Sequence, residues 1–420
     1  MTNLLKILLN KLQLPSIIVW LRYLNFKNHF KSFFSPPKIY KNSEISSKKI
    51  ALIALFEKGK LRNDVKRLLI SLKNKGFDVV GINTQQLEES EREIFDLYIE
   101  RFNFGRDFGS YKLGFLNLFK MKALELEKLV LLNDSVFYTK SNLENFIDEL
   151  SDKSYDVIGA TENFEISHHL GSFCISISGE VFRSKKFRSY WKNFKLSDMR
   201  PNNIKFGEMY FSKALFACAR NKDKIKILYS TNRLISYLEK NPDAVKHFNK
   251  YSRKSYYVDW ARPSGREIIK SMLFKSASKS LLSTMQLEQA DKPLSFEFDV
   301  DSDDYEFVDN YEGIETFLSK AGLSVPSTEL LKSIKQTIIY TYRQGSQIHQ
   351  NTFWNLAMGC PIIKNDSVYR GMMNMDDVLE LKEYIGEKDF KEFSEIVLSN
   401  AYGGHALKKW RLVAFMHGYI

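Results

Sequence analysis

The stretch Ile50-Ala-Leu-Ile-Ala-Leu-Phe56 is an uninterrupted apolar run of strand length. Such a run predicts a strand that is buried on both faces, as in a parallel sheet. Phe77-Asp-Val-Val-Gly-Ile82 predicts a second strand. Between the two strands, apolar residues recur at helical spacing and end just before a glycine: Val65, Leu68, Leu69, Leu72 and Gly76. Strand, helix and strand in this order indicate a β-α-β unit, and hence an α/β fold with a mainly parallel sheet.

The same alternation continues toward residue 220. Further strands are predicted at residues 94–100, 129–132, 156–160 and 171–178. Helices are predicted at residues 111–124, 141–150, with Ser141 as N-cap, and 205–220.

Changes in composition divide the chain into three predicted segments. Residues 1–45 are a basic amphipathic segment and linker, and residues 46–250 form the α/β domain. The linker is the proline-containing polar run at residues 35–48. Residues 251–420 are predicted to be mostly helical, in particular 262–292 and 327–420. An acidic, aromatic stretch at 297–313 interrupts them and is predicted to be a solvated acidic face or a flexible link.

The composition is that of a folded, basic protein, with 44% hydrophobic residues and a net charge of +12. A positive balance favours polyanionic partners such as nucleic acid, anionic lipid or phosphorylated donors and carriers. Nucleic acid is not favoured, because the basic residues are interleaved with acids and no arginine-rich arm, zinc-finger spacing or RNP-like motif occurs. Three separated cysteines, Cys174, Cys218 and Cys360, argue against a disulfide framework and indicate free thiols in a reducing cytoplasm.

The first stretch, MTNLLKILLNKLQLPSIIVWLRYL at residues 1–24, is apolar but is interrupted by basic residues and by Pro15. It contains no run of the roughly 20 apolar residues that a spanning helix needs, and no convincing secretory signal. Leucines at helical spacing beside lysines, followed by aromatic residues mixed with Lys27 and Lys31, fit a helix that lies on an anionic leaflet. A helix packed on the body of the protein is the alternative. We expect a cytoplasmic protein, peripheral on the inner face of the cytoplasmic membrane if the first alternative holds.

The polar loop Arg101-Phe-Asn-Phe-Gly-Arg-Asp-Phe-Gly-Ser-Tyr111 is the strongest local signal of a site. Gly105 and Gly109 permit backbone conformations that side chains forbid. Asn103 and Asp107 offer the directional hydrogen bonds that a ribose or base needs, and Arg106 could bind a diphosphate. A simple polar turn before a helix remains the alternative.

A second signal, Asn133-Asp134-Ser135, ends a predicted apolar strand. In open α/β sheets, ligands bind beyond the carboxyl ends of the strands. An acid there can hold a divalent cation, Mg²⁺ or Mn²⁺, which offsets the charge of a diphosphate as it leaves. A strand-ending turn is the alternative for Asp134.

Candidate acid/base groups follow farther along the chain. Glu162, His168 and His169 lie in one polar stretch, although a lone histidine is more often structural than catalytic. Glu208 stands near the start of a predicted helix, where it is a candidate catalytic base, an acceptor ligand or a favourable helix-end charge. We rank Glu208 first as base and Glu162 second.

In this order, the motifs resemble those of the rhamnan synthesis protein F family of polysaccharide glycosyltransferases. The similarity covers roughly residues 50–220 and 349–375. The matching residues are Asn103, Gly105, Asp107 and Tyr111; Leu131 to Val136; Gly159, Thr161 and Gly171 to Phe173; Phe187 to Trp191; Gly207 and Glu208; Asn351 to Trp354; and Gly359 to Lys364.

The resemblance implies a GT-A-like nucleotide-sugar-binding domain that transfers a sugar, rhamnose or a related hexose, to a bacterial surface polysaccharide such as lipopolysaccharide, or to a lipid-linked glycan. A dTDP- or UDP-sugar is the implied donor. Asn103, Gly105 and Asp107 would line the nucleotide, together with Arg106 and Tyr111. Residues 133–135 would occupy the place of the usual Asp-x-Asp metal motif, although only Asp134 is acidic here.

Two other classes compete with a sugar transferase. One is a non-enzymatic, membrane-associated scaffold of a glycan-assembly complex, which the basic composition also fits. The other is a nucleotide-dependent enzyme of another kind, such as a phosphoryl transferase. The sequence lacks the Gly-x-x-x-x-Gly-Lys-Ser/Thr loop that many such enzymes carry.

Overall fold

The computed structural model describes residues 2–121, 125–251, 310–320, 325–368 and 372–399, and the single residues 268, 413 and 416, with side chains from residue 15 onward. The chain forms two compact units, Met1–Tyr229 with Gly359–Ile420, and Ser230–Met358. Residues 359–399 thus lie in the first unit. The predicted division into domains at residues 46–250 and 251–420 stays a prediction. Most of the predicted helix at 262–292, and all of the acidic stretch up to residue 309, lie outside the described residues.

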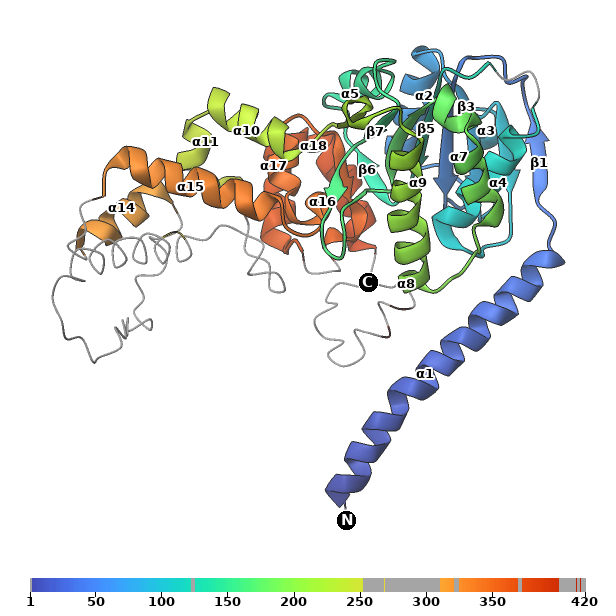
Figure 1. The fold of residues 1–420 in the computed structure, drawn as a ribbon, viewed down its shortest axis with the longest axis horizontal. Helices are drawn as coiled ribbons and strands as arrows, with labels where there is room; N and C mark the ends of the chain where they lie inside the picture. The colour runs from blue at the N-terminus through green and yellow to red at the C-terminus, as the bar shows by residue number, and fades with distance from the viewer. Residues whose placement is uncertain are drawn as a thin grey trace. The chain divides into compact units, whose positions relative to one another are not determined.

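The first unit is built on an eight-stranded sheet of order β1-β4-β3-β2-β5-β10-β7-β11 (Figure 1). Its strands are β1 (Lys38–Lys41), β2 (Lys49–Leu55), β3 (Asp78–Asn83), β4 (Leu97–Glu100), β5 (Lys128–Asn133), β7 (Val157–Gly159), β10 (Cys174–Ser178) and β11 (Ile225–Ile227). Four of the seven pairings are parallel: β2 with β3, β2 with β5, β3 with β4, and β7 with β11. The predicted α/β fold with a mainly parallel sheet is confirmed.

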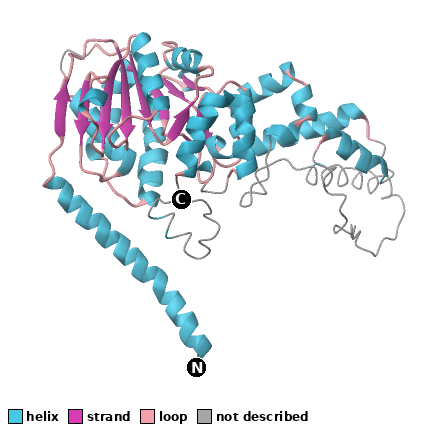
Figure 2. Cartoon of the chain, turned by 180° about the vertical axis from the view of Figure 1, so that it is seen from behind, coloured by secondary structure: helices cyan, strands magenta, loops and turns pink. Residues whose placement is uncertain are grey.

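Helices cover the sheet (Figure 2). They are α2 (Asn63–Asn74), α3 (Glu89–Arg92), α4 (Arg106–Leu118), α5 (Leu143–Leu150), α6 (Gly179–Arg183), α7 (Lys185–Asn193), α8 (Arg200–Asn202) and α9 (Tyr210–Cys218), with α1 (Thr2–Phe33) before the sheet. Alternate residues of β2, such as Leu52, join a core with α4, α7 and α9 that is rich in aromatic rings. Gly114 lets α4 approach β2 closely, because a Cβ there would lie 2.5 Å from Leu52.

The order of the strands creates a switch point between β2 and β5. From β2 the chain adds β3 and then β4 on one side, and it next adds β5 on the other side of β2. Because β2, β3, β4 and β5 are parallel, their carboxyl ends share one edge of the sheet. Open α/β sheets bind ligands in the crevice at such a point.

Several local predictions are wrong in detail. Residues 38–41 of the predicted linker form the edge strand β1, which pairs with β4. The helix expected at residues 111–124 begins at Arg106, so the second half of the polar loop is helical. Ser141 does not cap α5; its N-cap is Asn142, whose φ of 60° is in the left-handed region. The predicted helix 205–220 is a π-helical turn (Asn203–Met209) that continues into α9.

The C-terminal region is mostly helical, as predicted. The second unit contains α10 (Thr231–Lys240), α11 (Asp243–Lys246), α12 (Phe248–Tyr251), α14 (Tyr311–Lys320), α15 (Ser327–Tyr342), α16 (Gln347–Gln350) and α17 (Thr352–Ala357). In the first unit, β12 (Ile362–Lys364) pairs with β6 (Val136–Tyr138) and is followed by α18 (Met375–Leu398). The sequence did not predict β12, which carries Lys364 back to the end of β5.

Candidate functional site

Polar groups gather at the carboxyl ends of β2, β3 and β5. One Asp134 carboxylate oxygen accepts a hydrogen bond from the Phe56 backbone N–H, and this bond spans the switch point between β5 and β2. The Asn83 side chain, at the end of β3, bonds to the Glu57 carbonyl oxygen at 2.8 Å. The strand ends are therefore joined by side chains in addition to backbone hydrogen bonds such as Asp134 N–H to the Ala54 carbonyl oxygen.

Arg62 lies among the carboxylates that follow β2 and β5. Its guanidinium is 3.5 Å from Glu57 and 2.9 Å from Asp64, and it donates to the Asp134 carbonyl oxygen at 2.7 Å. Burial raises the pKa of Glu57 to about 8, although Arg62 opposes the shift. Burial likewise raises the pKa of Asp134 to about 6. One arginine thus faces more acid than it can neutralise in a site withdrawn from water.

This cluster predicts that stability falls as the pH rises. Glu57 has an ordinary pKa of 4.5 and a folded pKa of about 8, so the folded state holds the proton more tightly. Stability is therefore lost between about pH 4.5 and about pH 8, by up to ~1 kcal/mol per pH unit. Urea unfolding across this range measures the slope. We expect Glu57→Gln to flatten the slope above about pH 6, where Asp134 no longer contributes, and Glu144→Gln, at a 55% exposed side chain, to leave it unchanged. A steep slope that persists in Glu57→Gln would assign it to other groups.

The predicted loop at residues 101–111 has a specific and unusual backbone. Gly105 has a φ of 85° and Arg106 a φ of 51°, so the N-cap and the first residue of α4 are both left-handed. The half-buried Arg101 guanidinium bonds to three carbonyl oxygens of the loop, those of Phe102, Phe104 and Arg106. These bonds stabilise the positive φ angles of Gly105 and Arg106, which an ordinary turn before a helix does not require.

Asp198 fixes the same loop from outside. Its carboxylate accepts the Gly105 backbone N–H at 2.7 Å, and its carbonyl oxygen accepts Arg106 Nε at 3.1 Å. A Cβ at Gly105 would lie 3.0 Å from Leu196, so the position has little room for a side chain. The Arg106 guanidinium, predicted to meet a diphosphate, therefore makes at least one bond within the protein.

A chain of polar contacts runs from α4 across β5 to β12. The Asn133 amide donates to Asp107 at 2.9 Å, and Ser135 Oγ donates to the Asn133 side-chain oxygen at 2.6 Å. Lys364 Nζ then donates to Ser135 Oγ at 2.6 Å and lies 5.7 Å from the centre of the Phe173 ring. Burial raises the pKa of Asp107, whereas the charge of Lys364 lowers it. The site therefore combines the half-buried Asp107 carboxylate with the nearby Lys364 ammonium.

Glu208 faces this chain from the π-helical turn before α9. Ser172 Oγ lies 3.3 Å from one Glu208 carboxylate oxygen, and His169 Nε2 lies 3.5 Å from the other. His169 Nδ1 bonds to the Ser167 carbonyl oxygen at 2.7 Å, which fixes the ring. Burial favours the neutral acid, but the nearby His169 side chain, together with the charges of Lys364 and Arg200, outweighs it and lowers the pKa of Glu208. Glu208 is thus held as a carboxylate that can accept a proton.

The structure brings most of the predicted site residues together. Asp107, Asn133, Ser135 and Asp134 line the carboxyl end of β5, and Tyr111 donates to the Ser172 carbonyl oxygen at 3.1 Å. The charge of Glu208 acts on Asp107, which connects the two halves of the site. These residues are Asp107, Tyr111, Asn133, Asp134, Ser135, His169 and Glu208. Their catalytic and binding roles stay predictions.

Three predicted residues are placed differently. Asn103 is exposed, and Arg106 bonds to the Asp198 carbonyl oxygen. Glu162, the second candidate base, is 2.5 Å from His168, whose ring stacks between Phe164 and Phe216. Glu208, rather than Glu162, therefore has the contacts expected of a base beside Asp107.

Sequence reasoning missed four charged residues of the site. Glu57 lies two residues after the end of β2, so the rule that ligands bind beyond strand ends could have found it. Arg62 is near it in sequence and pairs with it. Lys364 lies 229 positions from Ser135, and Asp198 lies 93 positions from Gly105, so no local pattern could have placed them.

The predicted metal ligand, Asp134, has the carboxylates of Glu57 and Asp107 near it, and the Arg62 guanidinium is the cation that faces them. Among the residues that the structure describes, no group of three or more His, Cys, Asp or Glu side chains is arranged to bind a metal. Asp134 also accepts a backbone N–H, and the neighbouring Ser135 accepts Lys364. The groups around Asp134 and Ser135 fit a positively charged side chain of the protein better than a metal ion held by the protein alone.

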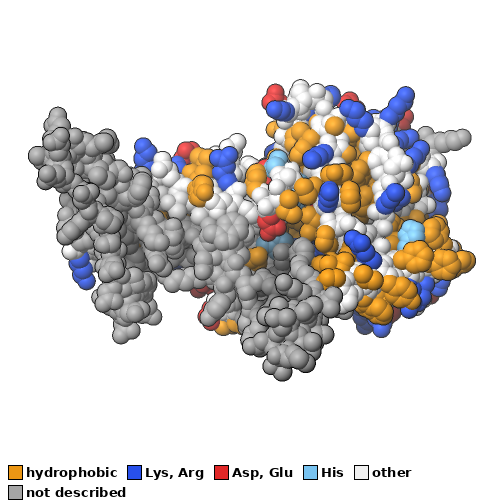
Figure 3. Space-filling view, turned by 60° about the horizontal axis from the view of Figure 1, so that its bottom comes forward, with side chains coloured by type: hydrophobic (Ala, Val, Ile, Leu, Met, Phe, Trp, Pro, Cys, Tyr) orange, Lys and Arg blue, Asp and Glu red, His pale blue; other side chains and the backbone are white. Residues whose placement is uncertain are grey.

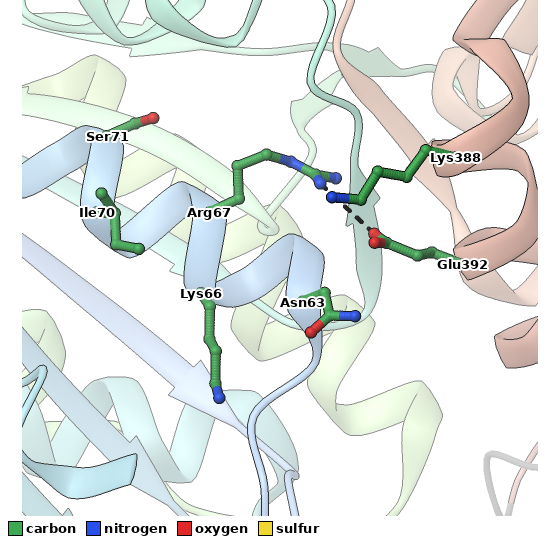
Figure 4. A pocket seen from close by; sticks show the side chains of 7 residues that line it. All are labelled: Asn63, Lys66, Arg67, Ile70, Ser71, Lys388 and Glu392. Atoms are coloured by element: carbon green, nitrogen blue, oxygen red, sulfur yellow. Dashed lines mark hydrogen bonds and ion pairs between the residues drawn. The ribbon is translucent and has the colours of Figure 1, made fainter. Parts of the chain in front are cut away.

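A separate pocket of about 420 Å³ lies between α2 and α18 (Figure 4). Its lining residues are Asn63, Lys66, Arg67, Ile70, Ser71, Lys388 and Glu392. Arg67 is paired with Asp389 at 3.0 Å and with Glu392 at 3.4 Å, and Lys66 with Glu91 at 2.6 Å. No predicted site residue lines this pocket, and most of its cations are already neutralised.

Comparison with known proteins agrees with the resemblance predicted from the motifs. Residues 79–232 match the model of the family described as RgpF, rhamnan synthesis protein F. A curated relative, the uncharacterized protein y4gN of Sinorhizobium fredii (strain NBRC 101917 / NGR234), is 28% identical over 172 residues, which are 39% of this chain and 45% of that protein. The match thus spans less than half the length of this relative. The rhamnan synthesis protein F match runs from β3 to the start of α10 and contains the loop at Gly105, the end of β5 and Glu208.

Proposed function

We propose that this chain is a glycosyltransferase of polysaccharide synthesis. It moves a sugar, rhamnose or a related hexose, from a dTDP- or UDP-linked donor to a surface polysaccharide or a lipid-linked glycan. The observation that carries the proposal is the position of Glu208 and His169 beside the polar chain Asp107–Asn133–Ser135–Lys364, at the switch point of the sheet. The family match over residues 79–232 supports it, because that family is named for rhamnan synthesis.

In this proposal the donor nucleotide occupies the edge of the sheet beyond β4, β2 and β5, as in a GT-A-like domain. The loop at Gly105 presents Asp107 and the start of α4 to the nucleotide. The hydrogen bonds of the loop to Arg101 and Asp198 keep these groups in place without rearrangement. Lys364, hydrogen-bonded to Ser135, lies where a diphosphate would need a positive charge. A divalent cation bound through Asp134 and the diphosphate oxygens is the alternative source of that charge.

Glu208 is the general base of the proposed reaction. The acceptor hydroxyl gives its proton to the Glu208 carboxylate as its oxygen attacks the anomeric carbon, and the bond from that carbon to the diphosphate breaks. Its carboxylate is ionised because His169 stabilises the charge against the effect of burial. His169 acts as a positioning residue, because its contacts are with Glu208 and the Ser167 carbonyl oxygen.

A thermal-shift panel of nucleotide sugars tests the proposal, followed by mass analysis of the products. We expect one nucleotide family to stabilise the protein and Asp107→Asn to lose most of that stabilisation. Lys388→Gln, in the pocket between α2 and α18, is the matched control and should keep it. If no nucleotide sugar shifts the melting temperature, a glycan-assembly scaffold becomes the better reading. If Lys388→Gln abolishes the shift, the donor binds at α18 instead.

A further inference from the structure

Helix α1 presents an exposed stripe of large apolar side chains. Phe26, Phe33 and Phe34 are 66%, 71% and 72% exposed, values that are unusual for phenylalanine. The stripe consists of Val19, Trp20, Tyr23, Phe26, Phe30, Phe33 and Phe34. At about 100° per residue, these positions fall within one arc of about 140° around the helix. Figure 3 shows hydrophobic side chains gathered together on one side of the face that it presents.

The opposite side of α1 is docked on the protein. Leu21 is buried, and it shares a face with Asn25 and Asn28 at helical spacing. The Asn25 side-chain oxygen accepts the Asp198 backbone N–H at 2.7 Å, and the Asn28 amide donates to the Asp198 carboxylate at 3.0 Å. His29 packs edge-on against the buried Phe104 ring at 5.2 Å. Because one face is fixed in this way, the aromatic stripe is held pointing outward.

The charge around the stripe has one sign. Residues 1–43 contain no Asp or Glu, but they contain seven basic residues: Lys6, Lys11, Arg22, Lys27, Lys31, Lys38 and Lys41. On the helical wheel, Lys27 and Lys31 lie along one edge of the aromatic arc and Arg22 lies along the other. All three of these side chains are exposed. An apolar stripe with basic edges is complementary to an anionic lipid surface, where rings enter the headgroup boundary and cations meet phosphates.

We propose that α1 docks this protein on the surface of an anionic lipid bilayer, with the aromatic stripe in the headgroup region and the basic edges on the lipid phosphates. The helix lies on the surface; no helix among the described residues is long and apolar enough to cross a membrane. This inference does not depend on sugar transfer. It has a consequence for the site, since Asp198 links α1 to the Gly105 backbone and so fixes the loop relative to the lipid surface.

Vesicle flotation of the full chain tests the proposal. We expect binding to vesicles of phosphatidylcholine with phosphatidylglycerol, weaker binding at high salt, and little binding to phosphatidylcholine alone. The variant Phe26→Ser/Phe30→Ser/Phe33→Ser should lose flotation. Lys27→Gln/Lys31→Gln should bind about 10-fold more weakly or worse. The matched control Leu379→Ser/Leu398→Ser removes two 59% exposed leucines from α18 and should float like the wild type.

Each variant is first compared with the wild type by circular dichroism and melting temperature, since the stripe makes few contacts and its loss should not unfold the chain. Equal flotation of the aromatic variant and the wild type would overturn the proposal. So would equal binding to neutral and anionic vesicles. Light scattering tests whether a second copy of the chain binds the stripe instead. If the wild type is a dimer, and the aromatic variant is a monomer that floats unchanged, the stripe is a self-association surface.

Discussion

Glu208→Gln is expected to lower kcat for sugar transfer by roughly 10²–10⁴-fold, the usual contribution of a positioned general base. Glutamine keeps the size of the side chain and can still bond to Ser172, but it cannot take the acceptor proton. Donor binding should be nearly unchanged, because the proposed role concerns the acceptor. Steady-state kinetics with donor titration separates the two effects. A variant with wild-type kcat would rule out Glu208 as the base.

The pH profile distinguishes a base from a residue that only shapes the site. Because His169 lowers the pKa of Glu208, wild-type kcat should fall only at pH values below the pKa of an ordinary glutamate side chain. His169→Gln removes the opposing charge, so burial then dominates and the acid limb of the profile should move to higher pH. A structural role for His169 would reduce the activity without moving that limb.

How far the sequence could predict this fold depended on the range of the contacts involved. The apolar runs at Ile50–Phe56 and Leu129–Leu132 predicted buried parallel strands, because only a strand covered on both faces is apolar throughout. The end of the second run also predicted a polar site at residues 133–135. These features are local, so the pattern of neighbouring residues contains them.

Other features could not be predicted, because they depend on distant partners. The loop at residues 101–111 was expected to lead into a helix at residue 111, but Arg101 and Asp198 hold Gly105 and Arg106 in left-handed conformations, and α4 already begins at Arg106. Strand β1 is short and exposed, and it exists because β4 offers an edge to pair with. Lys364 reaches Ser135 only because β12 pairs with β6. In each case tertiary contacts override the local preference.

Lys364→Ala gives the second large effect. If its ammonium stabilises the leaving diphosphate, its removal should lower kcat by roughly 10²–10³-fold, the loss observed when one preorganised group is taken from a developing charge. The affinity for the nucleoside diphosphate product, measured by calorimetry, should fall in parallel. Lys364→Arg should recover part of both, because it keeps the charge but not the geometry. Lys388→Ala is the matched control on α18, outside the site.

A chelator distinguishes a divalent cation from Lys364 as the source of the positive charge. If Lys364 carries the charge, EDTA should leave wild-type activity unchanged. Loss of activity with EDTA, together with a mild effect of Lys364→Ala, would instead place a divalent cation at Asp134 and reduce Lys364 to a neutralising partner of Asp107. The latter role would make Asp107 easier to protonate in Lys364→Ala, because the ammonium lowers the pKa of Asp107 against burial. A lysine that acts only on Asp107 would therefore affect donor binding more at acidic than at neutral pH, whereas a diphosphate ligand would affect it at both.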